Sequence, residues 1–397
     1  MIAVEYLLNI AAVILLVPVS IVLLQVLLAL TFRGEQPIPS VRRPRVTVLI
    51  PAHNEALGIA EAVATIKEQL EAGDGLLVVA DNCTDDTKDI AVRIGAEVIE
   101  RKNAQQQGKG FALDYGIRYL ESDPPDIVII IDADCAVEPG TIEELALRCA
   151  ISGAPMQAYY RMMGPKSGGL MARVAEFAWL MKNFVRPLGF LRVNLPCQLM
   201  GTGMAFPWSL LANADLATGN LVEDLKLGID LALSGHPARF CPSAEVTSKF
   251  PSNRNVAHKQ RTRWEHGHLD LIVRSFPRLI ARSIVSCRRD ACALVLDLAV
   301  PPLASLMLLA MLLFGLNTFA VCFNISLLPF VLSALVLAML GAAVLLAWQR
   351  WGRQVLTFGD LLCAPLYAAS KIPLYARFWT ARQKEWVRTD RDGTNGA

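Results

Sequence analysis

The run Ile127–Ile131 constrains the fold most, because five branched apolar residues lead directly into Asp132 and Asp134. It is too short for a membrane helix, and an unbroken run of this kind is typical of a strand buried on both faces of a parallel sheet. Ligands of open α/β sheets bind at the carboxyl ends of such strands. Two carboxylates there predict a site for Mg²⁺ or Mn²⁺ carrying phosphates, and the alternative is a surface strand end with two solvated acids.

Polar side chains follow the other strands predicted in this part of the chain. Residues 46 to about 250 alternate between strand and helix patterns, which indicates a mostly parallel sheet covered on both faces. Asn54 and Glu55 follow the strand 46–50, and Asp81 follows the strand 76–80. Parallel strands send their carboxyl ends to one edge, so we expect these groups to converge with Asp132 and Asp134.

Lys109 lies between Gly108 and Gly110 at the start of a predicted helix. Two glycines let the backbone approach a phosphate, and the lysine adds a point charge. The spacing is not that of a P-loop, and an ordinary glycine-rich turn is the alternative interpretation. A helix-capping role is likewise an alternative for the acids that follow Asp81.

Two long uncharged segments predict about three transmembrane helices. The first runs from Tyr6 to Phe32, and the second lies between Asp297 and Arg350, with a polar turn expected at 317–326. Asp297 falls at the start of the second segment, and because a charge is costly in lipid we expect it to face other helices or the cytoplasmic end. Arginines follow the first segment and flank the second, which predicts a cytoplasmic α/β domain and an N-terminus outside.

These signals divide the chain into six parts. We expect an N-terminal transmembrane helix, a catalytic α/β domain, an interfacial helix with a linker, two further transmembrane helices, an interfacial or re-entrant segment and a cytoplasmic tail. Whether 358–375 spans the membrane stays open. The boundaries, in that order, are 1–34, 35–270, 271–290, 291–350, 351–380 and 381–397.

Composition excludes some classes of protein. A net charge of +2 argues against a general nucleic-acid binder. The nine cysteines form neither a CxxC pair nor a cluster with histidine at zinc spacing, so we interpret them as reduced residues of a cytosol-facing domain and membrane helices.

Six motifs in this order resemble those of family 2 glycosyltransferases. Pro51–Glu55, Asp81–Thr87, Gly108–Gly110 and Asp132–Asp134 are similar to the nucleotide-sugar half of these enzymes, which have the GT-A fold, a Rossmann-like α/β fold. Val222–Asp224 and Gln260–Trp264 resemble the Glu-Asp and Gln-x-x-Arg-Trp motifs of the membrane-integrated branch, which includes cellulose, hyaluronan and poly-N-acetylglucosamine synthases. The likeness covers residues 46 to 270, but the stretch 199–206 departs from the cellulose-type pattern.

The resemblance implies a role for each group. Asp132 and Asp134 are the expected metal ligands, and Asp224 is the expected general base, with helix capping as its alternative. Arg263 suits a two-pronged contact with the diphosphate, and Trp264 suits stacking on an acceptor sugar; a basic interfacial helix is the alternative. The expected nucleotide-sugar contacts are Pro51, Asn54, Glu55, Asp81, Lys109, Asp132, Gln260 and Arg263, and the expected acceptor contacts are Trp264, Gly203 and Glu223.

The predicted function is inverting transfer of a sugar from a nucleotide-diphosphate sugar, preferably a UDP-sugar, to a lipid-linked or growing polysaccharide acceptor. We expect the chain in a bacterial inner membrane, in envelope or exopolysaccharide biosynthesis. A processive polysaccharide synthase is the alternative, for which three spans are few unless a homo-oligomer supplies more. A membrane nucleotidyltransferase shares the metal-diphosphate chemistry and is the alternative from another class.

Overall fold

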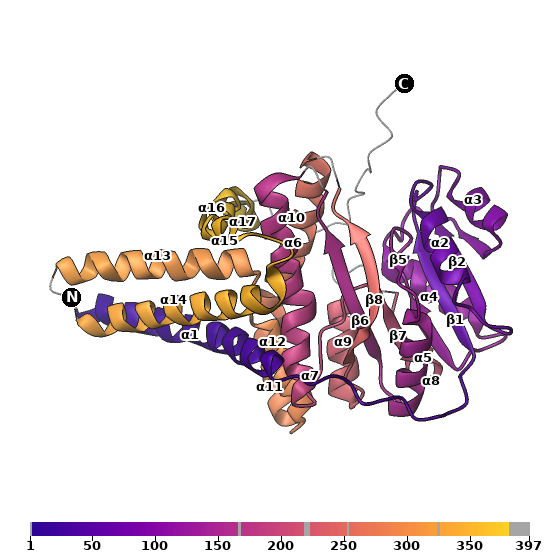
Figure 1. Ribbon diagram of the computed structural model, residues 1–397, viewed down its shortest axis with the longest axis horizontal. Helices are drawn as coiled ribbons and strands as arrows, with labels where there is room; N and C mark the ends of the chain where they lie inside the picture. Colours follow the sequence, from indigo (N-terminus) through magenta and orange to yellow (C-terminus); the bar gives the residue numbers. More distant parts are fainter. Residues whose placement is uncertain (1, 166–167, 218–222, 252–253, 324–325, 381–397) are drawn as a thin grey trace.

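The computed structural model describes residues 2–165, 168–217, 223–251, 254–323 and 326–380; the predicted tail 381–397 and Val222 lie outside them. Figure 1 shows a sheet surrounded by helices at one end of the molecule and three long helices projecting toward the other end. The strands are β1 Val46–Ala52, β2 Gly75–Asp81, β3 Glu97–Arg101, β4 Ile127–Ile130, β5 Ala136–Val137, β6 Met156–Met163, β7 Met204–Pro207 and β8 Arg239–Lys249.

The helices fall into three groups along this axis. Those around the sheet are α2 Ile59–Lys67, α3 Thr87–Ile94, α4 Lys109–Leu120, α5 Thr141–Ser152, α8 Trp208–Leu211 and α9 Glu223–Ser234. Those between the sheet and the long helices are α6 Gly169–Leu180, η1 Met181–Val185, α7 Arg186–Arg192, α10 Arg254–Asp270, η2 Leu271–Ser275, α11 Phe276–Val285 and α12 Arg289–Leu298. The remainder are α1 Ile2–Leu30, α13 Leu303–Cys322, α14 Leu327–Ala347, η3 Trp348–Gly352, α15 Phe358–Leu362, α16 Ala364–Ser370 and α17 Ile372–Thr380.

The eight strands form one sheet in the order β3-β2-β1-β4-β7-β6-β8-β5. The first four in this order are parallel, whereas β7 runs antiparallel to both β4 and β6. The mostly parallel sheet that the sequence predicts is thus a mixed sheet, and only its first four strands are all parallel to one another. Within that half, β1, β2 and β4 deliver their polar tips to one edge. Since β7 runs the opposite way beside β4, the chain just before β7 reaches that same edge.

Both faces of the parallel half are buried, which explains the unbroken apolar runs. Val48 and Ile50 pack on one face under α2 and α5, while Leu49 packs on the other face under α4. Gly116 in α4 makes this second contact close, because an added Cβ would lie 2.6 Å from Leu49 Cδ1. Burial on both faces fixes the strand register, and with it the position of each strand tip.

One continuous helical segment, formed by α6, η1 and α7, connects the sheet with the long helices. Val174 belongs to the core on one face of the sheet, whereas Val185 and Leu188 lie on η1 and α7, which contact α1. All three side chains are buried, as apolar residues at helical spacing along one segment should be. Because η1 is a π-helical turn, the helical face that α6 turns toward the sheet is not in line with the face that α7 turns toward α1.

Among the described residues, three helices are long and apolar enough to cross a membrane: Ala3–Leu30, Leu303–Cys322 and Leu327–Gly352. They agree in number with the predicted spans, and α14 packs against both α1 and α13 (Figure 1). The predicted polar turn at 317–326 begins too early, because α13 continues to Cys322. Asn317 lies buried inside that helix and donates to the Pro329 carbonyl at 2.9 Å.

Asp297 lies on α12 rather than inside a membrane helix, because Pro301 and Pro302 separate α12 from α13. Its carboxylate accepts hydrogen bonds from Gln25 and Gln198, both at 2.6 Å, and pairs with Arg186 at 2.6 Å. The prediction that Asp297 faces other helices is thereby confirmed. This buried cluster joins α1, α7 and α12 to the segment that leads into β7.

Candidate active site

Lys109 is the centre of the polar edge of the sheet. Its ammonium is paired with the Asp132 carboxylate and donates to the Gly201 carbonyl at 2.6 Å. Asp224 reaches the same point, because a Cβ added to Gly201 would lie 3.4 Å from Asp224 Oδ2 and 3.7 Å from Lys109 Nζ. Residues from α4, β4, the segment before β7 and α9 therefore meet here, which brings together three of the predicted site residues.

The segment Gly201–Gly203 allows this approach. Gly201 and Gly203 have φ angles of +90° and +66°, a region that side chains with a Cβ avoid. Between them the Thr202 hydroxyl accepts a hydrogen bond from the Asp132 backbone N–H at 3.0 Å. The buried Gln157 amide spans the segment, accepting from Met200 N–H at 2.8 Å and donating to the Thr202 carbonyl at 2.9 Å. Gly203, a predicted acceptor contact, thus has a backbone role that the structure shows directly.

Asp132 and Asp134 are the groups that could bind a divalent cation. One ligand atom from each, together with Cys135 Sγ, lies within 4.8 Å of the others. Burial raises the pKa of the Cys135 thiol well above its ordinary value, so it stays protonated and is a poor ligand. The two carboxylates offer the hard oxygens that Mg²⁺ and Mn²⁺ prefer. Ser248 adds a hydroxyl 3.4 Å from Asp134.

Burial and nearby charges shift the pKa values of the two acids opposite Lys109, Asp224 and Glu223. Burial raises the pKa of Asp224, and the nearby Lys109 charge opposes this rise only in part. Burial, and next the charge of Asp224, raise the pKa of Glu223. Burial lowers the pKa of Lys109, but the surrounding carboxylates outweigh it and raise this pKa, so the lysine stays charged. The site thus holds a cation between two acids that bind protons more readily than exposed ones.

Asp81 lies at the tip of β2 but its carboxylate already has partners. It pairs with Arg101 at 2.7 Å and accepts from the Asn82 amide at 3.0 Å. Arg101 also donates to the Gln106 carbonyl at 2.8 Å, in the loop that leads to α4. The Asp81 side chain therefore joins β2 and β3 to the loop preceding Gly108 and Lys109.

The turn after β1 packs against the turn after β2. Asn54 has φ +54° and accepts from the Thr84 backbone N–H at 2.7 Å. The Glu55 backbone N–H donates to the Thr87 hydroxyl at 2.8 Å, and the preceding Pro51 closes β1 beside β2. The predicted nucleotide-sugar contacts Pro51, Asn54 and Glu55 therefore share one rim with Asp81.

The Gln260–Trp264 motif lies on α10, on the side of the site that faces the long helices. Trp264 packs edge to face with Trp179 of α6, with ring centroids 5.1 Å apart. Gln260 and Arg263 are half-buried on the same helix. Arg261, which the sequence did not single out, places its guanidinium 5.3 Å from the Phe250 ring centroid.

Sequence reasoning missed several residues that shape the site. Arg101 carries no local signal, since its partner Asp81 is 20 residues away in another strand. Gln157 and Thr202 are equally isolated, although the two glycines around Thr202 indicate a tight backbone. Lys182 of η1 looks in the sequence like the polar face of an amphipathic helix, yet its charge influences Asp224.

Comparisons with known proteins agree with this geometry. A family profile described as "Glycosyltransferase like family 2" matches residues 44–267. The chain is 27% identical over 260 residues to the probable glycosyltransferase YdaM of Bacillus subtilis, covering 58% of this chain and 57% of that protein. It is 34% identical over 138 residues to the low-salt glycan biosynthesis hexosyltransferase Agl6 of Haloferax volcanii, covering 34% of this chain and 31% of that one. The chain thus spans about half or less of these relatives.

A solved structure shares the fold over nearly the whole chain. The mannosyltransferase PcManGT of Pyrobaculum calidifontis, in complex with GDP-Man and Mn²⁺, superposes with a TM-score of 0.59 at 18% identity. The match covers 95% of this chain and 100% of that one, so it includes the long helices as well as the sheet.

Proposed function

Since the chain belongs to glycosyltransferase family 2, we propose that it transfers a sugar from a nucleotide-diphosphate sugar to a lipid-linked acceptor, with inversion at the transferred carbon. The observation that carries this proposal is the meeting of Asp132, Lys109 and Asp224 at Gly201. One acid there belongs to the DxD pair, and the other comes from a separate element. A single displacement needs this division, with the leaving group on one side and a base on the other.

The donor half of the site is built around the diphosphate. Asp132 and Asp134 would bind Mg²⁺ or Mn²⁺, the latter being the ion in the PcManGT complex. Such an ion neutralises the charge that develops on a departing diphosphate. Lys109 adds a positive charge beside it, at a helix start where backbone N–H groups also favour an anion. The rim from Pro51 to Asp81 would contact the base and ribose.

Asp224 is the proposed general base. An acceptor hydroxyl loses its proton in the transition state, and a carboxylate with a raised pKa is a better acceptor for it near neutral pH. Lys109 orients this acid by charge, and the absence of a side chain at Gly201 leaves room in front of it. Glu223 would support the acceptor side of the site, and Gln260, Arg263 and Trp264 would close it toward the long helices.

The proposed setting is a bacterial inner membrane, with the sheet domain in the cytoplasm. The three apolar helices support it, as do the arginines that follow α1 and η3. A lipid-linked acceptor fits this setting because its reacting end lies at the bilayer surface. A processive polysaccharide synthase stays the second candidate, and it would require a homo-oligomer to supply more spans.

The test is donor turnover by the full-length protein in detergent, with Mn²⁺, a panel of UDP- and GDP-sugars and a membrane lipid extract. We expect sugar-dependent release of nucleoside diphosphate, and a lipid product that is one sugar heavier by mass spectrometry. Asp224→Asn should lower kcat by at least about a hundredfold, the usual contribution of a general base, while leaving nucleotide binding intact. The matched control is Asp230→Asn, an exposed acid two turns further along α9.

Four outcomes would contradict parts of the proposal. Release of pyrophosphate would indicate a nucleotidyltransferase. Full activity of Asp224→Asn would remove it as the base, and loss of nucleotide binding in that variant would assign it to the donor. A ladder of product masses would favour the processive synthase.

A further inference from the structure

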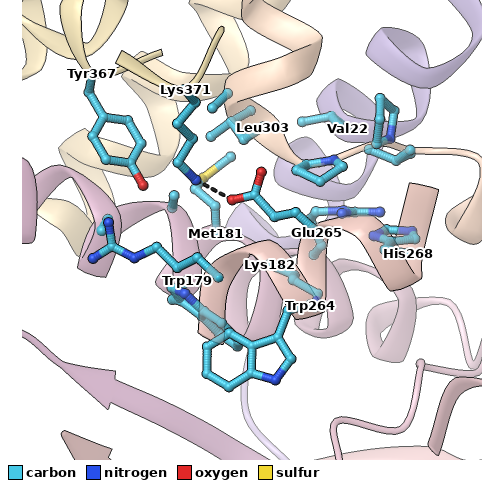
Figure 2. A pocket seen from close by; sticks show the side chains of 18 residues that line it. Val22, Trp179, Met181, Lys182, Trp264, Glu265, His268, Leu303, Tyr367 and Lys371 are labelled. Atoms are coloured by element: carbon cyan, nitrogen blue, oxygen red, sulfur yellow. Dashed lines mark hydrogen bonds and ion pairs between the residues drawn. The ribbon is translucent and has the colours of Figure 1, made fainter. Parts of the chain in front are cut away.

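A cavity of about 100 Å³ lies between the sheet domain and the long helices. Its walls come from α1, α6, η1, α7, α10, α13 and α16, from the residues joining α12 to α13 and from Lys371 after α16. Figure 2 shows Trp179 and Trp264 on one side of it and Lys371, paired with Glu265, on the other. The reaction proposed above uses only Trp264 of these residues, so the cavity has no assigned occupant.

The cavity is lined by four cations and one carboxylate. Two of the cations are neutralised, since Arg186 pairs with Asp297 at 2.6 Å and Lys371 pairs with Glu265. For the other two, Lys182 and Arg261, no carboxylate of the described residues lies within ion-pair distance. A partly buried positive charge without a counter-ion is costly, and it favours an anionic ligand.

Lys182 and Arg261 are held in place by aromatic rings. The Lys182 ammonium lies 5.1 Å from the Trp179 ring centroid, and the Arg261 guanidinium lies 5.3 Å from that of Phe250. The Arg261 Nε is buried and, within the described part of the chain, has no hydrogen-bond acceptor. Burial lowers the pKa of Lys182, and an anion in the cavity would reverse this effect. Both cations thus lie against an aromatic ring, and among the described residues neither has a carboxylate within ion-pair distance.

An apolar cavity of about 40 Å³ continues from the charged one. The two share Ala178, Leu303, Ala304 and Tyr367, and the second extends between α13 and α14 along Met307, Leu340 and Val344. Its lining is almost entirely apolar, and two of its helices are among those able to cross a membrane. A ligand that fills both spaces needs an anionic head and a hydrocarbon chain.

We propose that these two cavities bind a lipid phosphate, with the phosphate between Lys182 and Arg261 and the hydrocarbon chain between α13 and α14. The inference rests on the proposed function and deepens it: the acceptor is a lipid whose phosphate is recognised here, while its reacting hydroxyl lies in front of Asp224. The phosphate positions the acceptor and takes no part in bond exchange. Charge favours it over a neutral glycan in the same space, because a glycan would leave both cations without a counter-ion.

The test is calorimetric titration of the full-length protein in non-ionic detergent, without donor, using farnesyl phosphate, farnesol and inorganic phosphate as probes. Farnesyl phosphate should bind at least about tenfold more tightly than farnesol, the usual effect of hydrogen bonds to a charged group. Lys182→Gln and Arg261→Gln should each remove most of this advantage, and Lys182→Arg should retain it. Lys88→Gln, which removes a half-exposed cation of α3 that pairs with Glu100, is the control and should bind like the unchanged protein.

Each other result overturns the proposal. Equal affinity for farnesyl phosphate and farnesol would show that the phosphate is not recognised. Equal affinity for farnesyl phosphate and inorganic phosphate would show that the hydrocarbon chain is not recognised. If Lys88→Gln lost as much affinity for farnesyl phosphate as Lys182→Gln, the lipid phosphate would be attracted by the general charge of the protein and not by this cavity. A circular-dichroism melting curve checks that each variant is folded. If Lys182→Gln does not fold, the test rests on Arg261→Gln. Because no donor is present, lipid-phosphate binding by a protein that turns over no nucleotide sugar would reject only the proposed function.

Discussion

The Asp224 side chain combines burial with a nearby lysine, and both matter to its chemistry. An exposed aspartate would be fully ionised at neutral pH but a weak base, since its pKa is near 3.8. Burial shifts the pKa of Asp224 upward, and the charge of Lys109 opposes part of this shift. The proposed base therefore accepts a proton more readily than an exposed aspartate does.

The pH dependence of the reaction should report this shift. The base acts when deprotonated, and its pKa is raised, so kcat/KM should fall as the pH drops through a value above 3.8. The measurement is kcat/KM against pH with the active donor, with Asp230→Asn as a control that keeps the same profile. An acid limb at or below the ordinary aspartate pKa would contradict the assignment of Asp224.

At the scale of elements, α7 crosses α1 at close range. Gly189 faces the α1 backbone, and an added Cβ would lie 1.9 Å from the Gln25 carbonyl oxygen. The glycine thus lets the helix leading from the sheet domain lie directly on the first apolar helix. Gln25 is one turn from neighbours that also bury small side chains, Val22 and Ala29.

Gly189→Ala should destabilise the protein by about 1–3 kcal/mol, the usual cost of overpacking. The measurement is the apparent Tm in detergent, which should fall. Gly315→Ala in α13 is the control, because a Cβ there meets no atom within 4 Å. Equal melting of the two variants would show that α1 and α7 can separate without cost.

Elements were easier to predict from the sequence than their contacts. The apolar runs ending in Asp81 and Asp132 predict both strands and the shared edge, because a buried strand shows its apolar pattern in consecutive residues. The partners of these acids, Arg101 and Lys109, are fixed by loops and sheet order, which local pattern does not encode. Asn317 shows the opposite error, since a polar residue in an apolar run resembles a turn but is a buried helix residue.

At the scale of the molecule, Asp297 connects the sheet domain with the helix bundle. Its carboxylate is bonded to α1 through Gln25, to α7 through Arg186 and to the segment before β7 through Gln198. That segment continues to Gly201, which lies beside Asp224. The Asp297 cluster therefore contacts the same stretch of chain that borders the proposed base.

Removing one side of this cluster should be costly. Asp297→Ala leaves Arg186 buried without its counter-ion, and we expect a loss of about 3–5 kcal/mol in stability. The double variant Asp297→Leu with Arg186→Met should recover most of that loss, because it removes both charges together. Thermal unfolding in detergent measures both, with Asp230→Ala as the exposed control. A single variant as stable as this control would contradict the role of the cluster.

The order of the helices along the chain has a consequence for biosynthesis. The first apolar helix, α1, packs against α14, which begins at Leu327. The whole sheet domain lies between these two helices in the sequence, so the ribosome completes it before α14 is made. The contact between α1 and α14 therefore forms only after the last long helix has been synthesised.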